Sequence, residues 1–220
     1  MATLFPAFST SAGRGDEDWI RKTLVRSIKF LIVIVGPAAL LLAFFARPLL
    51  LLWLGAKFAN EDTLVLQIMA AAIFFNSLAF VPYNLLYGVG RPDLPAKFHL
   101  AELPPYIVLV WFLVTRFGLP GVALARAFRV ILDFILLIGA ACWVTRTPAR
   151  LLASRDLRRS AATLTALGVG LALLWASAHG LIADAAFMLV LSGGFLMATW
   201  HYVLNLEKKW QIRLWLKLAR

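Results

Sequence analysis

The sequence predicts an all-α, polytopic transmembrane helical bundle with six spanning helices, an N-terminal cytoplasmic loop or helix and a C-terminal amphipathic helix. Two observations predict this fold class. Apolar residues make up 62% of the 220 residues and charged residues only 15%, against about 45–50% and about 25% in soluble domains. The apolar residues also gather in runs long enough to cross about 30 Å of hydrocarbon, which takes about 20 helical residues. This composition excludes a soluble enzyme, a disordered regulator and a nucleic-acid-binding domain.

The expected elements follow from these runs. Residues 1–27 read as the end of a truncated helix followed by a polar cytoplasmic loop, in which Asp16, Glu17 and Asp18 favour a helix start. Residues 28–145 form a four-helix portion, residues 146–160 a basic cytoplasmic loop, residues 161–207 two further spans and residues 208–220 a basic amphipathic tail. The expected spans cover residues 30–46 with an extension over 48–54, then 64–87, 98–115, 119–144, 161–178 and 185–206.

The distribution of positive charge predicts the orientation. Of the 22 Lys and Arg residues, 17 fall on one side of the expected spans, three on the other, and Arg126 and Arg129 within a span. Because positively charged loops stay in the cytoplasm, both termini are expected there. The net charge of +11 is then expected to face anionic lipids, and no nucleic acid is expected as a partner. In the tail, Lys209, Arg213 and Lys217 form a cationic stripe typical of a helix in the headgroup plane.

Four charged residues lie inside expected spans, where each costs at least about 2.5–3.5 kcal/mol. Arg126, Arg129 and Asp133 stand at i, i+3 and i+7 and share one helix face. They suit either an anion site, because a guanidinium matches phosphate oxygens bidentately, or a structural Arg129–Asp133 pair beside an Arg126 that extends to the interface. Glu102 is a candidate proton, cation or sugar-hydroxyl site, or an interfacial carboxylate paired with Lys97.

Asn76 and Asn84 are further candidate substrate ligands, although hydrogen bonds between helices explain them equally well. Chemistry motifs are sparse. The sequence has no phosphate-binding loop, no nucleophile in a recognisable signature, and three histidines (His99, His179 and His201) without metal-ligand spacing. We therefore expect no cofactor, no metal and no enzymatic activity.

Four stretches resemble a known family. They are LFPAFS at residues 4–9, LWLGAKFA at 52–59, YGVGRPDLPAK at 87–97 and FGLPGVALARAFRVILD at 117–133. In order and spacing they resemble the second half of polysaccharide flippases, above all O-antigen and exopolysaccharide flippases, of the multidrug/oligosaccharidyl-lipid/polysaccharide exporter superfamily. The lipid II flippase and the MATE drug antiporters are more distant relatives. The resemblance covers residues 4–144.

The resemblance implies a function. A chain of this kind would be the C-terminal half of a flippase that moves undecaprenyl-diphosphate-linked oligosaccharides to the outer leaflet by alternating access. Its partners would be that lipid-linked substrate and the missing N-terminal half of the transporter. The alternatives are a MATE-like organic cation antiporter, a membrane-bound glycan-modifying enzyme such as a glycosyltransferase or acyltransferase, and a non-transporting membrane subunit. Arg126 and Arg129 favour an anionic head group over an organic cation.

The orientation is testable with single cysteines. In a Cys142→Ser background, Ser160→Cys is expected to resist an impermeant thiol reagent in intact cells, because residue 160 ends the basic cytoplasmic loop. Ala178→Cys is expected to react. The opposite pattern, with labelling at 160 and protection at 178, would reverse the assigned orientation.

Overall fold

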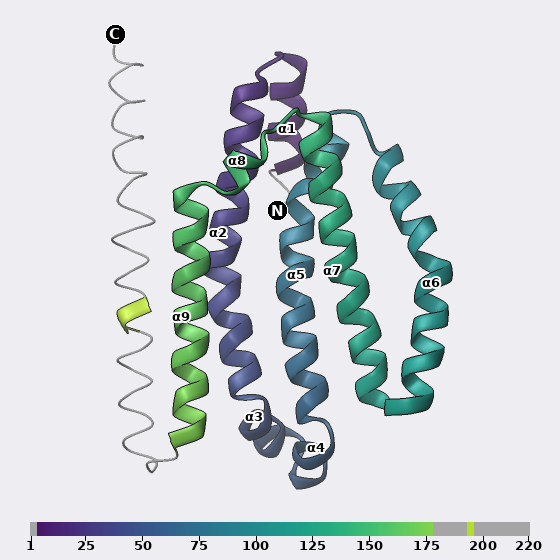
Figure 1. Ribbon diagram of the computed structural model, residues 1–220, viewed down its shortest axis with the longest axis vertical. Helices are drawn as coiled ribbons and strands as arrows, with labels where there is room; N and C mark the ends of the chain where they lie inside the picture. Colours follow the sequence, from purple (N-terminus) through teal and green to yellow (C-terminus); the bar gives the residue numbers. More distant parts are fainter. Residues whose placement is uncertain (1–3, 178–192, 196–220) are drawn as a thin grey trace. The chain divides into compact units, whose positions relative to one another are not determined.

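The computed structural model describes residues 4–177 and 193–195, and every regular element assigned there is a helix (Figure 1). The chain divides into two units, Met1–Leu152 and Ala153–Arg220. The first unit holds α1 (Leu4–Gly13), α2 (Glu17–Phe44), α3 (Ala46–Trp53), α4 (Ala56–Glu61), α5 (Thr63–Gly88), α6 (Asp93–Phe117), α7 (Leu119–Val144) and α8 (Ala149–Leu152). The second unit holds α9 (Arg155–Ser177).

Four helices of the described part are long and apolar enough to cross a membrane: α2, α5, α6 and α7. They confirm the all-helical membrane fold, and α7 has the bounds that the sequence predicted, 119–144. The helix α9 occupies the region of the span predicted at 161–178. The span at 185–206 and the tail at 208–220 lie outside the described residues, so the six-span topology stays a prediction.

The long helices of the first unit stand in the order α2, α5, α7, α6. Helix α5 packs between α2 and α7, and α6 packs on the other side of α7 with little contact to α5 (Figure 1). The core side of α5 is apolar, with Leu78, Val81 and Leu85 buried. Helix α6 is an edge helix whose outer side chains are apolar and exposed, among them Ile107 and Trp111. Exposed apolar side chains suit contact with lipid.

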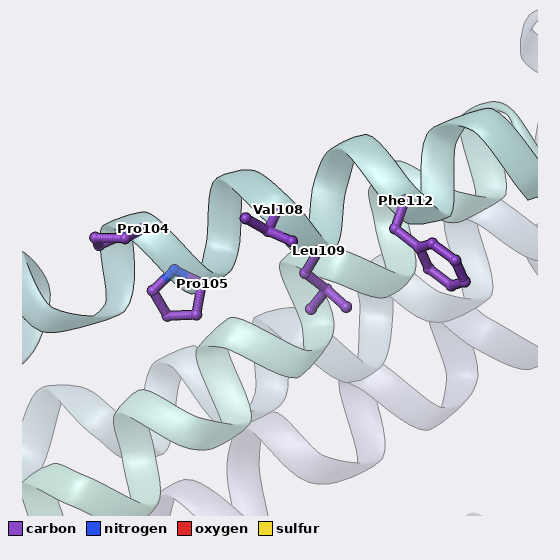
Figure 2. A pocket seen from close by; sticks show the side chains of 5 residues that line it. All are labelled: Pro104, Pro105, Val108, Leu109 and Phe112. Carbon is purple, nitrogen blue, oxygen red and sulfur yellow. The ribbon is translucent and has the colours of Figure 1, made fainter.

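A shallow hollow of about 490 Å³ runs along α6. It is lined by Pro104, Pro105, Val108, Leu109 and Phe112 (Figure 2). All five side chains come from one helix and carry no polar group, so the hollow offers nothing to orient a polar ligand. Helix α6 stays helical through both prolines, although each removes a backbone donor.

The beginning of the chain is more helical than the sequence indicated. The polar loop expected after the N-terminal helix end is instead helical up to Gly13. The expected helix start is present, since α2 begins at Glu17 and the Asp16 side chain accepts a hydrogen bond from Trp19 N at 3.0 Å. Packing explains the difference. Phe8 is fully buried, edge-on to Trp19, and lies so close to Gly88 of α5 that a Cβ there would be 2.6 Å from the Phe8 Cβ. Burial of Phe8 thus stabilises a helix that a Ser/Thr-rich segment would not form alone.

Helices α6 and α7 form a tight hairpin. Gly118 alone separates them, with φ of 62°, a conformation that glycine adopts without steric cost. At Gly121 a Cβ would overlap the backbone carbonyl of Leu113. The two backbones therefore meet closely at this end, and the hairpin sets the position of every α6 side chain that faces α7.

We expect Gly121→Ala to destabilise the protein by about 1–3 kcal/mol, because its methyl group must push α7 away from α6. The measurement is thermal unfolding of the purified chain in detergent. Gly139→Ala, in the same helix, is the matched control: its Cβ meets nothing within 4 Å, and the better helix propensity of alanine should leave stability equal or higher. Equal unfolding temperatures for the two variants would contradict the close packing at Gly121.

Candidate functional site between helices α5, α6 and α7

A buried carboxylate pairs with an arginine between α6 and α7. Glu102 of α6 is only 3% exposed, and Arg129 of α7 donates its Nε–H to Glu102 Oε2 at 3.4 Å. The same guanidinium lies over the Tyr106 ring, 4.9 Å from its centroid. A buried charge is tolerated only with a counter-charge and hydrogen bonds, and Arg129 supplies both. The pair therefore fixes which face of α6 turns toward α7.

Two further titratable residues extend this pair into a cluster. His99 Nδ1 lies 3.4 Å from Asp133 Oδ1 and 4.0 Å from Glu102 Oε2. One ligand atom from each of His99, Glu102 and Asp133 can be chosen so that all three lie within 4.8 Å of one another. In the part of the chain that the structure describes, His99 Nδ1, Glu102 Oε1 and Asp133 Oδ1 are buried without a hydrogen-bond partner. Such atoms are costly unless something else binds them.

A cavity of about 280 Å³ opens onto this cluster. Its walls carry Asn76, Tyr83, His99 and Asp133 together with apolar residues of α5 and α7. The rings of Tyr83 and His99 stack, with centroids 6.3 Å apart. A cavity of this size and polarity holds several water molecules or a small polar group, since a water takes about 30 Å³ of liquid volume. A separate hollow of about 40 Å³ lies beside Glu102, Tyr106 and Arg129.

The structure separates residues that the sequence placed on one face. Arg126 is exposed and makes no ion pair or hydrogen bond within the described ranges, whereas Arg129 contacts α6. Asn76 and Asp133 line the cavity. Asn84 instead donates to the Phe80 carbonyl of its own helix at 2.6 Å.

Two pairings considered from the sequence are not those of the structure. Arg129 pairs with Glu102 rather than with Asp133, and Lys97 pairs with Asp93, at 3.3 Å, rather than with Glu102. Close packing of α6 on α7 brings Glu102 to Arg129. Lys97 and Asp93 are neighbours at i and i+4 in the first turns of α6.

Sequence reasoning missed His99 as a member of the site. Spacing along the chain does not reveal this pair, because His99 lies in α6 and Asp133 in α7. One signal was present: His99 precedes Glu102 by three residues, so both lie on one face of a helix. His99, Glu102 and Asp133 form a group that could hold a metal ion, because imidazole and carboxylate are ligand types that metal ions use.

Spanning helices with a charged cluster between them define a multi-pass membrane protein. Residues 1–192 match the family described as "Lipid II flippase MurJ". The chain belongs to this family of flippases for lipid-linked molecules. This is a family of transporters rather than enzymes.

Curated relatives agree with this assignment. The chain is 30% identical over 117 residues to the "Putative O-antigen transporter" of Shigella flexneri, a match that covers 53% of this chain and 28% of that protein. It is 28% identical over 143 residues to the "Probable lipid II flippase MurJ" of Bdellovibrio bacteriovorus, with 63% and 27% covered. The chain thus spans little more than a quarter of the length of these relatives. No solved structure matches it.

We expect Arg129→Gln to destabilise the chain by about 3–5 kcal/mol, because it leaves Glu102 buried without a counter-charge. The double variant Glu102→Gln/Arg129→Gln should recover most of this loss, since a neutral amide pair replaces the ion pair. Thermal unfolding and membrane abundance measure both effects. Arg126→Gln, which removes an exposed arginine of the same helix, should retain wild-type stability; equal losses at 126 and 129 would contradict the role of the Glu102 pair.

Proposed function

We propose that this chain is the C-terminal part of a flippase that moves undecaprenyl-diphosphate-linked oligosaccharides across the bacterial inner membrane by alternating access. Family membership over residues 1–192 and the names of the two relatives support this proposal. Because the chain spans little more than a quarter of those relatives, it acts together with the remaining part of the transporter. Its cytoplasmic basic segments face anionic lipids.

In this proposal the guanidinium group of Arg126 binds the diphosphate of the substrate. The observation that carries it is a permanent cation inside a membrane-crossing helix, exposed and without an ion pair among the described residues. An arginine in that position is costly unless an anion or the interface compensates it, and its guanidinium fork matches phosphate oxygens. Arg129 has fewer free N–H groups for a phosphate, since its Nε–H is bound to Glu102 and its guanidinium lies over Tyr106.

In this proposal the sugar of the substrate binds to polar side chains in the cavity wall. Asn76 and Asp133 line the cavity of about 280 Å³, where an amide and a carboxylate can exchange hydrogen bonds with hydroxyl groups. Tyr83 and His99 add flat rings to the same wall. Glu102 acts mainly by holding Arg129, and Asn84 is the weakest of the candidates, because its amide is bound within its own helix.

A second function has one observation in its favour. With His99 neutral, the cluster of Glu102, Asp133 and Arg129 carries one excess negative charge next to the ring of Tyr83, which suits an organic cation. A MATE-like cation antiporter would need this cluster but not Arg126. Drug accumulation in cells that express the complete transporter separates the two functions: wild-type levels of export by Arg126→Gln would favour the antiporter.

The diphosphate role of Arg126 is tested by complementation of a strain that lacks its lipid-linked oligosaccharide flippase, with the complete transporter. Arg126→Gln should abolish surface polymer, and Arg126→Lys should restore little of it, since an ammonium cannot reproduce the bidentate contact. Membrane abundance is determined in parallel and should stay normal. Full complementation by Arg126→Gln at normal abundance would show that the arginine does not bind substrate.

A further inference from the structure

The cluster of His99, Glu102 and Asp133 has the geometry of a metal site. In a tetrahedral zinc site, bonds of about 2.0–2.2 Å place neighbouring ligand atoms about 3.3–3.6 Å apart. His99 Nδ1 and Asp133 Oδ1 are separated by 3.4 Å, yet neither makes a hydrogen bond within the described residues. With the imidazole neutral, two ligand atoms at this spacing and without a hydrogen bond between them can both bind one metal ion.

Glu102 completes a set of three ligands. Its Oε2 is held by Arg129 at 3.4 Å, whereas its buried Oε1 has no hydrogen-bond partner among the described residues. A carboxylate can ligate a metal with one oxygen while an outer hydrogen bond orients the other. One ligand atom of each residue lies within 4.8 Å of the other two, so the Glu102 carboxylate must turn toward His99 and Asp133 to reach the spacing of a tetrahedral site.

We propose that His99, Glu102 and Asp133 bind a divalent transition-metal cation, with Zn²⁺ the closest match. The imidazole excludes the hard cations, since Na⁺, Mg²⁺ and Ca²⁺ prefer oxygen ligands alone. Two carboxylates and one imidazole leave a fourth tetrahedral position, toward which the cavity of about 280 Å³ can supply a water molecule. The His99 side chain is 43% exposed, so the ion reaches the site along that side.

Charge balance supports a cation at this position. When both are ionised, Glu102 and Asp133 carry two negative charges against the single positive charge of Arg129, and both carboxylates are buried or nearly so. A divalent ion removes the repulsion between the two carboxylates and satisfies the three buried atoms at once. The proposal concerns the cluster itself and does not depend on what the flippase transports.

The test is metal binding by the purified 220-residue chain in lipid nanodiscs after chelator treatment. Titration with Zn²⁺ should reveal one tight site, and Co²⁺ as a spectroscopic probe should give the strong visible absorption of a four-coordinate ion. His99→Ala and Asp133→Asn should each weaken Zn²⁺ binding by more than about 100-fold, because loss of a ligand costs more than loss of an outer hydrogen bond. The double variant His179→Gln/His201→Gln should bind as the wild type does.

A measurement on the wild-type chain alone is needed as well, because the variants could misfold. X-ray absorption of the Zn²⁺-loaded wild-type chain should show a four-coordinate ion with one imidazole and otherwise oxygen ligands. Zn²⁺ should also raise the unfolding temperature of the wild-type chain, since a ligand that binds only the folded state stabilises it. Absence of a tight site in the wild type, an oxygen-only shell, or undiminished binding by His99→Ala and Asp133→Asn would overturn the proposal.

Discussion

The burial of one carboxylate, that of Glu102, governs the arrangement of α6 and α7. A charge buried in a membrane span is costly unless a counter-charge pairs with it, and Arg129 of the next helix supplies one to Glu102. Helix α6 packs on α7 and hardly on α5, so this pair determines how α6 is rotated about its axis. The apolar residues Ile107 and Trp111 then face outward, and His99 comes to lie beside Asp133.

Arg126 and Arg129 lie within one turn of α7, but their side chains have different surroundings. The side chain of Arg129 reaches α6, where a carboxylate and an aromatic ring hold it. That of Arg126 is exposed. Arg129 is therefore paired within the protein, whereas Arg126 has no ion pair among the described residues.

The sequence predicted the elements better than the contacts. The bounds of α7 were correct because Gly118 and Pro120 mark its start and the apolar run ends at Val144. The start of α6 was placed five residues late, because Asp93 and Lys97 are polar although they belong to its first turns. The pairing of Arg129 was open, since spacing along one helix suggested Asp133 and only the packing of α6 on α7 selects Glu102. His99 was missed for the same reason: its partner Asp133 belongs to another helix.

The single-residue turn at Gly118 is a point about which α6 can rotate relative to α7. About 24 Å of helix separates Gly118 from Glu102, at about 1.5 Å per residue, and the close contact at Gly121 holds the hinge end in place. A swing of α6 by about 10° about that hinge would carry Glu102 about 4 Å, more than the 3.4 Å that separates it from Arg129. A rotation too small to disturb the turn would therefore be enough to open the charged cluster at the far end.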